Sequence, residues 1–150
     1  MVKLVRTNSG NNDFIKLISL LDNELNERYG KEQDQYNQYN TLESIKNVVI
    51  AYDNKTSIGC GSFKEFDSDT VEIKRMYLKN DKRGSGAATQ ILDELEKWAA
   101  ELGYTKSVLE TGKGQPDAIK FYAKCGYKVM ENFGQYKGMP LSLCMSKIIL

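Results

Sequence analysis

The sequence contains no histidine, and among its 150 residues there are only two prolines and three cysteines. Histidine is the side chain most suited to accept protons near neutral pH, and it is a frequent metal ligand. Its absence argues against Ser-His-Asp hydrolysis and most zinc chemistry, so we expect no metal site. Cys60, Cys125 and Cys144 stand singly among apolar neighbours, which favours reduced core thiols over disulfides or thiolate metal ligands.

An excess of charge of either sign is also missing. The chain has 21 basic and 20 acidic side chains, interleaved along its length, for a net charge of +1. No broad cationic field is therefore expected, and neither nucleic acid nor a membrane is predicted as a partner. Residues 1–13 lack the apolar core of a signal peptide, and no segment approaches the ~20 apolar residues of a membrane span. We expect one cytoplasmic domain over residues 1–150.

Apolar spacing in the first half of the chain predicts one helix followed by three strands. The helix begins at Asn11 or Asn12, which can cap it, and ends at Gly30. Residues 31–40 are polar and without a period, as in a loop or a short exposed helix. The strands are predicted at residues 48–52, 57–63 and 71–78, with polar turns between them, so they form an antiparallel meander.

The second half predicts a crossover and a final pair of strands. The longest helix runs from Gly86 to Gly103 and leads into a strand at residues 104–109, which places that strand parallel to the preceding one. A shorter helix begins at Pro116 and closes at Gly126. The last strands are predicted at residues 127–130 and 141–148. The sheet is therefore of mixed direction, and the fold class is α+β.

The segment between the third strand and the longest helix is a candidate phosphate-binding turn. Gly84 and Gly86 allow the backbone to approach a ligand closely, while the N–H groups of a helix N-terminus carry partial positive charge. The alternative is an ordinary glycine turn before a helix. The mononucleotide P-loop does not fit, since no Gly-Lys-Ser/Thr follows. The dinucleotide fingerprint does not fit either, because Thr89 replaces its third glycine; Glu110 alone falls near that motif's acidic position.

Two motifs resemble the GNAT superfamily of N-acetyltransferases. Arg83, Gly86 and Ala88 match the family's Arg/Gln-x-x-Gly-x-Gly/Ala pattern. Residues 115–127 are similar to its Asn-x-x-Ala-x-x-x-Tyr-x-x-x-Gly-Phe segment, with Gln115 in place of the asparagine. The strand at residues 72–78 also resembles the strand that flanks acetyl-CoA. The resemblance implies a GNAT-like fold, with a mostly antiparallel mixed sheet of six to seven strands and about four flanking helices.

The resemblance also implies acetyl-CoA as co-substrate, with its diphosphate on the glycine turn and its pantetheine arm beside the third strand. The implied cofactor-binding residues are Met76, Tyr77, Leu78, Arg83, Gly84, Ser85, Gly86, Ala87, Ala88, Gln115 and Tyr122.

Glu72 and Tyr122 are the candidate catalytic residues. An alkylammonium with a pKa of ~10.4 must lose a proton before it can attack, and a carboxylate can accept that proton directly or through water. Glu72 lies on the strand beside the expected thioester, although a surface residue paired with Lys74 or Arg75 is an equal alternative. Tyr122 is the candidate general acid for the departing thiolate; a packing role is the alternative.

The acceptor is not identified by the sequence. Tyr29, Tyr36, Tyr39 and Tyr136 are aromatic candidates for its site, although Tyr36 and Tyr39 can equally anchor a polar loop. The favoured acceptor is the primary amine of a small molecule, with a protein N-terminus or lysine as the alternative. A non-catalytic acyl-CoA-binding module and a nucleotide-dependent oxidoreductase are the competing classes. A homodimer is compatible with the sequence.

Overall fold

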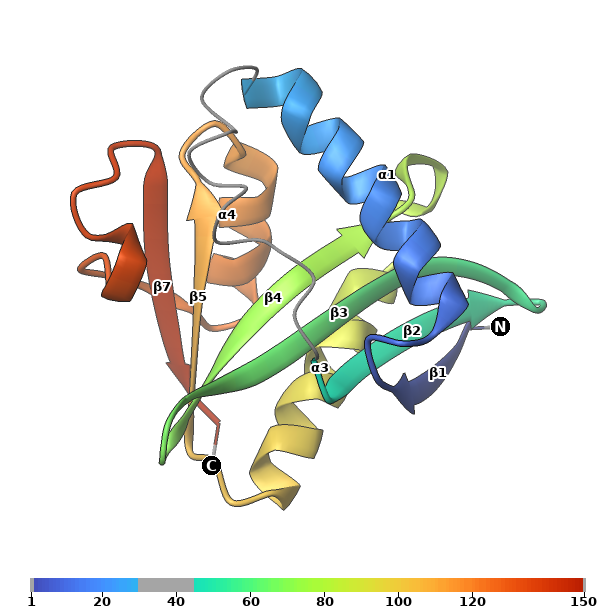
Figure 1. Ribbon diagram of the computed structural model, residues 1–150, viewed down its shortest axis with the longest axis horizontal. Coiled ribbons are helices and arrows are strands. Elements are labelled where there is room, and N and C mark those ends of the chain that lie inside the picture. Colours follow the sequence, from blue (N-terminus) through green and yellow to red (C-terminus); the bar gives the residue numbers. More distant parts are fainter. Residues whose placement is uncertain (1, 30–44, 150) are drawn as a thin grey trace.

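A seven-stranded mixed sheet runs through the molecule in the order β1-β2-β3-β4-β5-β7-β6 (Figure 1). The computed structural model describes residues 2–29 and 45–149. Within them β4 and β5 are the one parallel pair, as the crossover predicts, and the remaining neighbours are antiparallel. The strands are β1 (Val2–Thr7), β2 (Asn47–Asp53), β3 (Thr56–Asp67), β4 (Thr70–Leu78), β5 (Lys106–Gly112), β6 (Lys128–Met130) and β7 (Ser142–Ile148).

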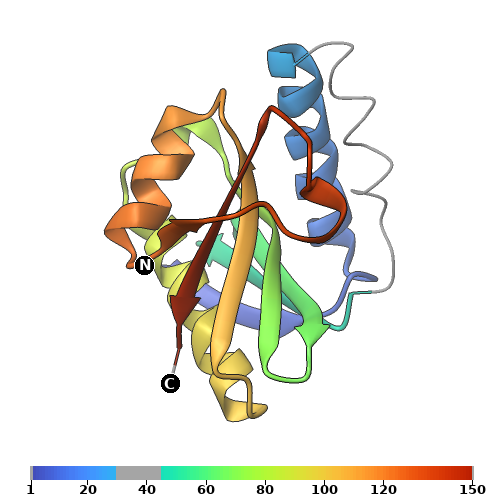
Figure 2. The same ribbon diagram turned by 90° about the vertical axis from the view of Figure 1, so that its left-hand side faces the viewer.

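Three α-helices in the described residues cover the two faces of this sheet. They are α1 (Asn12–Tyr29), α3 (Ala87–Glu101) and α4 (Pro116–Lys124), and Figure 2 shows α1 on the side opposite α4. The face under α1 buries Phe14, Leu17 and Ile18 against alternate residues of β2, while the other face buries Ile91, Leu92 and Leu95 of α3. With both faces of β2 covered, its centre is continuously apolar. The predicted α+β fold is confirmed.

Local signals placed two boundaries correctly. The side chain of Asn11 accepts hydrogen bonds from the backbone N–H groups of Asp13 (2.9 Å) and Phe14 (3.3 Å), so it caps α1. Asn54 and Lys55 have φ values of 49° and 73°, the positive values that a two-residue turn between β2 and β3 requires. Residues 31–40 lie outside the described part of the chain.

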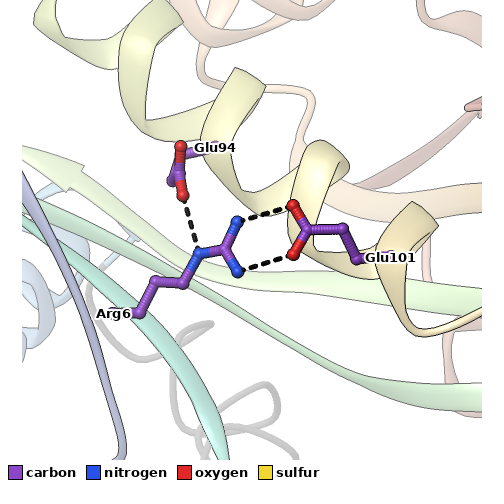
Figure 3. A network of polar contacts seen from close by, with 3 residues as sticks. All are labelled: Arg6, Glu94 and Glu101. Carbon is purple, nitrogen blue, oxygen red and sulfur yellow. Dashed lines mark hydrogen bonds and ion pairs between the residues drawn. The ribbon is translucent and has the colours of Figure 1, made fainter.

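The edge strand β1 was not predicted. It is short, and its partner β2 lies more than forty residues later, so no local turn announces the pairing. In the structure Arg6 of β1 donates from Nε to Glu94 at 2.7 Å, and from Nη1 and Nη2 to Glu101 at 2.9 and 3.1 Å (Figure 3). Its guanidinium also lies 5.0 Å from the ring centroid of Trp98. These contacts hold the edge strand against α3.

Of the helices in residues 2–29 and 45–149, none has the length and apolar character needed to cross a membrane.

Candidate functional site

A β-bulge in β4 forms one wall of the site. Ser62 of β3 lies opposite Lys74, and Cys60 lies opposite Tyr77, so β4 has one residue more than β3 between these pairs. Arg75 takes up the extra length with a φ of 60°, an unusual value for a residue with a side chain. Lys74 and Arg75 consequently line the same cavity although they are neighbours in a strand.

The site lies where β4 and β5 separate. The two strands pair only from Thr70 opposite Lys106 to Ile73 opposite Leu109, and beyond that point they diverge (Figure 1). Two adjoining cavities, of ≈ 140 and ≈ 310 Å³, open along the divergence. Both are lined by Leu21, Met76, Gln115, Ala118 and Tyr122. Because they share these residues, we treat them as the two halves of one cleft.

The larger half contains most of the residues predicted to hold the cofactor. Its predicted members are Met76, Tyr77, Leu78, Arg83, Gly84, Ala88, Gln115 and Tyr122. Of the other three, Ser85 donates from Oγ to the carbonyl oxygen of Lys82 at 2.6 Å, and the Ala87 side chain is buried in the core. Ala87 can therefore contribute only its backbone to a ligand. Gly86 is the residue that caps α3.

The glycine turn has the geometry that a phosphate cradle needs. Gly84 and Gly86 have φ values of 84° and 88°, which residues with a side chain rarely adopt. A Cβ placed at either position would have no other atom within 4 Å, so both face open space. The first N–H groups of α3 lack partners within their own helix and carry partial positive charge. This turn fits a diphosphate.

Arg83 makes contacts that its sequence position did not indicate. Its Nε donates to the carbonyl oxygen of Leu78 at 2.9 Å, and Nη1 and Nη2 each donate to the carboxylate of Glu24 at 3.0 Å. The guanidinium also lies 5.7 Å from the ring centroid of Tyr77. The guanidinium of Arg83, which the family resemblance implied as a cofactor-binding group, is therefore paired with a carboxylate of α1, and Glu24 lines the same half of the cleft.

We expect Glu24→Gln to bind coenzyme A more tightly than the parent. The substitution keeps the shape of the side chain but removes a negative charge that competes with phosphate for Arg83. An ion pair this exposed is worth little, so we expect a gain of about two- to fivefold in affinity, larger at low salt. Isothermal titration at two salt concentrations measures it. Asp53→Asn is the matched control, because Asp53 pairs with Lys82 of the same turn but does not line the cleft.

The smaller half of the cleft holds charged and hydroxyl side chains over an apolar floor. Its polar lining comprises Lys74, Arg75, Glu110, Thr111, Gln115, Tyr122 and Tyr136. Arg75 donates to Asp22 of α1 at 2.8 Å. Glu110 accepts a hydrogen bond from the Ser142 hydroxyl at 2.8 Å, and burial raises the pKa of its carboxyl above the usual value. This half therefore presents a carboxylate to the cleft.

Sequence reasoning gave Glu110 no catalytic role. It lies at the first position of β5 past the paired stretch, across the divergence from the bulge of β4. Its signal was an acidic residue that directly follows the apolar pair Val108 and Leu109, two positions before Gly112. The parallel pairing of the two strands was predicted, but the point at which they separate was not.

Glu72 lies deeper than Glu110. It is only 3% exposed and does not line either cavity. Its Oε2 accepts a hydrogen bond from the Tyr136 hydroxyl at 3.4 Å and lies 4.0 Å from the Lys74 ammonium. A contact with Lys74 was expected for a surface residue, but here both side chains are buried. Tyr136 and Lys74, which both contact Glu72, line the smaller half of the cleft and separate Glu72 from it.

The four predicted acceptor tyrosines have different outcomes. Tyr136 is buried and lines the smaller half of the cleft. Tyr29 is the last residue of α1, and its side chain lies outside the described part of the chain. Tyr36 and Tyr39 lie outside the described residues altogether.

Tyr122 of α4 lies between the two halves and lines both. Its side chain packs against Phe121 and Tyr127, with ring centroids 5.1 and 5.9 Å away. Burial raises the pKa of its hydroxyl well above the usual value, and the nearby Cys125 and Glu110 raise it further. The phenol is therefore protonated at neutral pH and can donate a hydrogen bond.

Comparison with known proteins agrees with this geometry. The profile of the Acetyltransferase (GNAT) family matches residues 14–127. The IAA acetyltransferase of Azospirillum brasilense is 31% identical over 135 residues, which cover 89% of this chain and 88% of that protein. A solved structure from Klebsiella pneumoniae, described as an acyl-CoA N-acyltransferase, superposes with a TM-score of 0.82 at 24% identity, over 100% of this chain and 99% of the other.

The PaiA N-acetyltransferase of Thermoplasma acidophilum, solved in complex with coenzyme A, has a TM-score of 0.72 at 20% identity and covers 99% of both chains. Structural relatives of this chain therefore bind coenzyme A. The family match covers the glycine turn, both halves of the cleft except the β6–β7 connection, and the helix that carries Tyr122. The chain belongs to the Acetyltransferase (GNAT) family of N-acetyltransferases.

Proposed function

We propose that this acetyltransferase transfers the acetyl group of acetyl-CoA to the primary amine of a small molecule, in a complex that holds both substrates. One observation carries the proposal: the glycine turn and the half-buried carboxylate of Glu110 open into the two halves of one cleft, with Tyr122 between them. The smaller half has a volume of ≈ 140 Å³, which favours a small acceptor over a folded protein surface.

The residues of the larger half suit coenzyme A. Acetyl-CoA supplies an acetyl group activated as a thioester. The open space at Gly84 and Gly86, together with the first turn of α3, can hold the diphosphate. Beyond the bulge, the main chain of Met76 and Leu78 runs beside the cleft, where its N–H groups can hydrogen-bond the pantetheine arm and the thioester carbonyl.

Glu110 is the carboxylate we assign to proton transfer from the acceptor. It lines the half of the cleft opposite the cofactor residues, and a raised pKa makes a carboxylate a stronger base. Glu72, the candidate from the sequence, is the alternative and would act through Tyr136 or water. In either case the carboxylate takes the proton that the ammonium must lose before its nitrogen can attack.

We expect Tyr122→Phe to lower the single-turnover rate of thiol release by about tenfold, which is below the usual range for acid catalysis, without changing coenzyme A affinity. The substitution removes one hydroxyl and keeps the ring packing. Since burial raises the pKa of this phenol, it is a hydrogen-bond donor to the leaving sulfur rather than a strong acid. Rapid-quench measurements at saturating amine exclude product release from the comparison. A parental rate in the variant would make Tyr122 a packing residue.

A binding panel followed by a turnover panel tests the proposed function. Thermal stabilisation is measured with acetyl-CoA, coenzyme A, ATP and NADH, and thiol release is then followed with small primary amines and with peptides carrying free N-termini or lysines. We expect stabilisation by acetyl-CoA and coenzyme A alone, and turnover with small amines. Faster turnover with peptides than with small amines would indicate that the acceptor is a protein. Binding without turnover on any amine would indicate a non-catalytic module.

A further inference from the structure

The connection between β6 and β7, residues 131–141, together with the first residue of β7, supplies a hydroxyl to each of the two carboxylates of the site, half-buried Glu110 and buried Glu72. Ser142 donates from Oγ to Oε2 of Glu110 at 2.8 Å. Tyr136 donates to Oε2 of Glu72 at 3.4 Å. The connection lies on the same side of the sheet as α1 (Figure 2). One short stretch of chain therefore contacts both candidate bases.

A single side chain organises this connection. The amide nitrogen of Asn132 donates to the carbonyl oxygens of Tyr136 (3.2 Å), Met139 (3.4 Å) and Ser142 (3.2 Å). Phe133 packs edge-on against Tyr136, with ring centroids 5.5 Å apart. These contacts fix the backbone at both hydroxyl-bearing residues, and a carboxylate held by a fixed donor keeps its orientation.

We propose that Ser142 is a positioning residue for Glu110: its hydroxyl holds the cleft-facing carboxylate ionised and directed at the acceptor, and Asn132 holds the chain that presents it. The inference rests on the proposed function. Ser142 of β7 is 1% exposed and pairs with Gly112 of β5, so its hydroxyl is shielded from bulk water. Its bond to Glu110 is also shorter than the bond from Tyr136 to Glu72.

Several titratable and charged groups surround Glu110, and the Ser142 hydroxyl is one of the two that favour its ionised form. The pKa of the Glu110 carboxyl responds to the charges of Lys74 and Glu72 on β4. Its own charge raises the pKa of three neighbouring groups: Tyr122 of α4, Tyr136 of the connection and Cys144 of β7. Arg75 lines the same half of the cleft. Burial and Glu72 disfavour the charged carboxylate, whereas Lys74 and the Ser142 hydroxyl favour it. Removing the hydroxyl therefore raises the pKa of Glu110.

The test compares the parent with Ser142→Ala, Ser142→Thr and Tyr136→Phe by two readouts. One is the titration of the Glu110 carboxyl by carbon NMR in the protein alone, and the other is the acid limb of the kcat/KM profile. In Ser142→Ala we expect both to move to higher pH by about one unit, as for the loss of one hydrogen bond to a charged group. Ser142→Thr keeps the hydroxyl and should restore both.

Tyr136→Phe instead removes the hydroxyl that donates to Glu72, so we expect the Glu110 titration to move less than in Ser142→Ala. Because Tyr136 also lines the smaller half of the cleft, we expect a higher KM for the acceptor. An unchanged Glu110 titration in Ser142→Ala overturns the proposal, as does an acid limb that moves with Tyr136→Phe but not with Ser142→Ala. Alanine introduces no new atom into the strand, and a thermal melt checks that the fold is retained. Absence of turnover in the parent would instead overturn the proposed function, while the NMR readout would still decide whether Ser142 controls Glu110.

Discussion

Gly86→Val should reduce the affinity for coenzyme A by about a hundredfold or more, equivalent to ~2.7 kcal/mol of binding free energy. Gly86 has a φ of 88° and caps α3, and a Cβ at this position points into open space where the diphosphate is proposed to lie. A branched side chain there would hold phosphate oxygens away from the backbone N–H groups of the turn. Isothermal titration with coenzyme A measures the loss directly.

Gly103→Val is the matched control for this experiment. Gly103 follows the other end of α3 and has a φ of 98°, and a Cβ there also has no other atom within 4 Å. Both substitutions place a β-branched residue in a left-handed conformation, which costs ~1–3 kcal/mol, so we expect similar losses in Tm. Only Gly86→Val should lose the ligand. Equal coenzyme A affinity in the two folded variants would place the diphosphate elsewhere.

Local sequence patterns predicted the secondary structure around the larger half of the cleft correctly. Gly84 and Gly86 precede α3 in left-handed conformations, and the helices that apolar periodicity predicted are present as α3 and α4. The turn and the family resemblance named residues that the structure groups around the larger half of the cleft, while their role in binding the cofactor stays a prediction. The edge strand β1 did not follow, because it is defined by its pairing with β2 and by the contacts of Arg6 with α3.

The parts that depend on three-dimensional register were not predicted. The bulge at Arg75 places Lys74 and Arg75 in one cavity, whereas strand alternation would put them on opposite faces. The separation of β4 from β5 exposes Glu110 to the cleft and leaves Glu72 behind Tyr136. Glu24 reaches Arg83 from α1, fifty-nine positions away in the sequence. No local sequence pattern indicates any of these contacts, because each depends on how separate elements pack.

Glu110→Gln should lower kcat by about a hundredfold to ten-thousandfold, the range that general acid-base catalysis supplies, with coenzyme A affinity retained. Glutamine keeps the size of the side chain and can still accept the Ser142 hydroxyl, so the structure around it should persist. It cannot accept a proton from the acceptor ammonium. Steady-state thiol release with a saturating small amine measures kcat, and titration with coenzyme A checks that the larger half of the cleft is intact.

The pH dependence of Glu110→Gln separates a lost base from a damaged site. In the parent, burial raises the pKa of Glu110 above the ~4.3 of an ordinary glutamate. Activity should therefore fall as the pH drops through that raised pKa, because the base becomes protonated. Without the base, the rate should follow the fraction of unprotonated amine, rising about tenfold per pH unit up to an amine pKa of ~10.4. Glu72→Gln is the comparison, because it removes the deeper carboxylate of the pair. If Glu72→Gln acquires the steep profile while Glu110→Gln keeps the parental one, the proton passes through Tyr136 or water to Glu72, and Glu110 serves the acceptor only as a neighbouring charge.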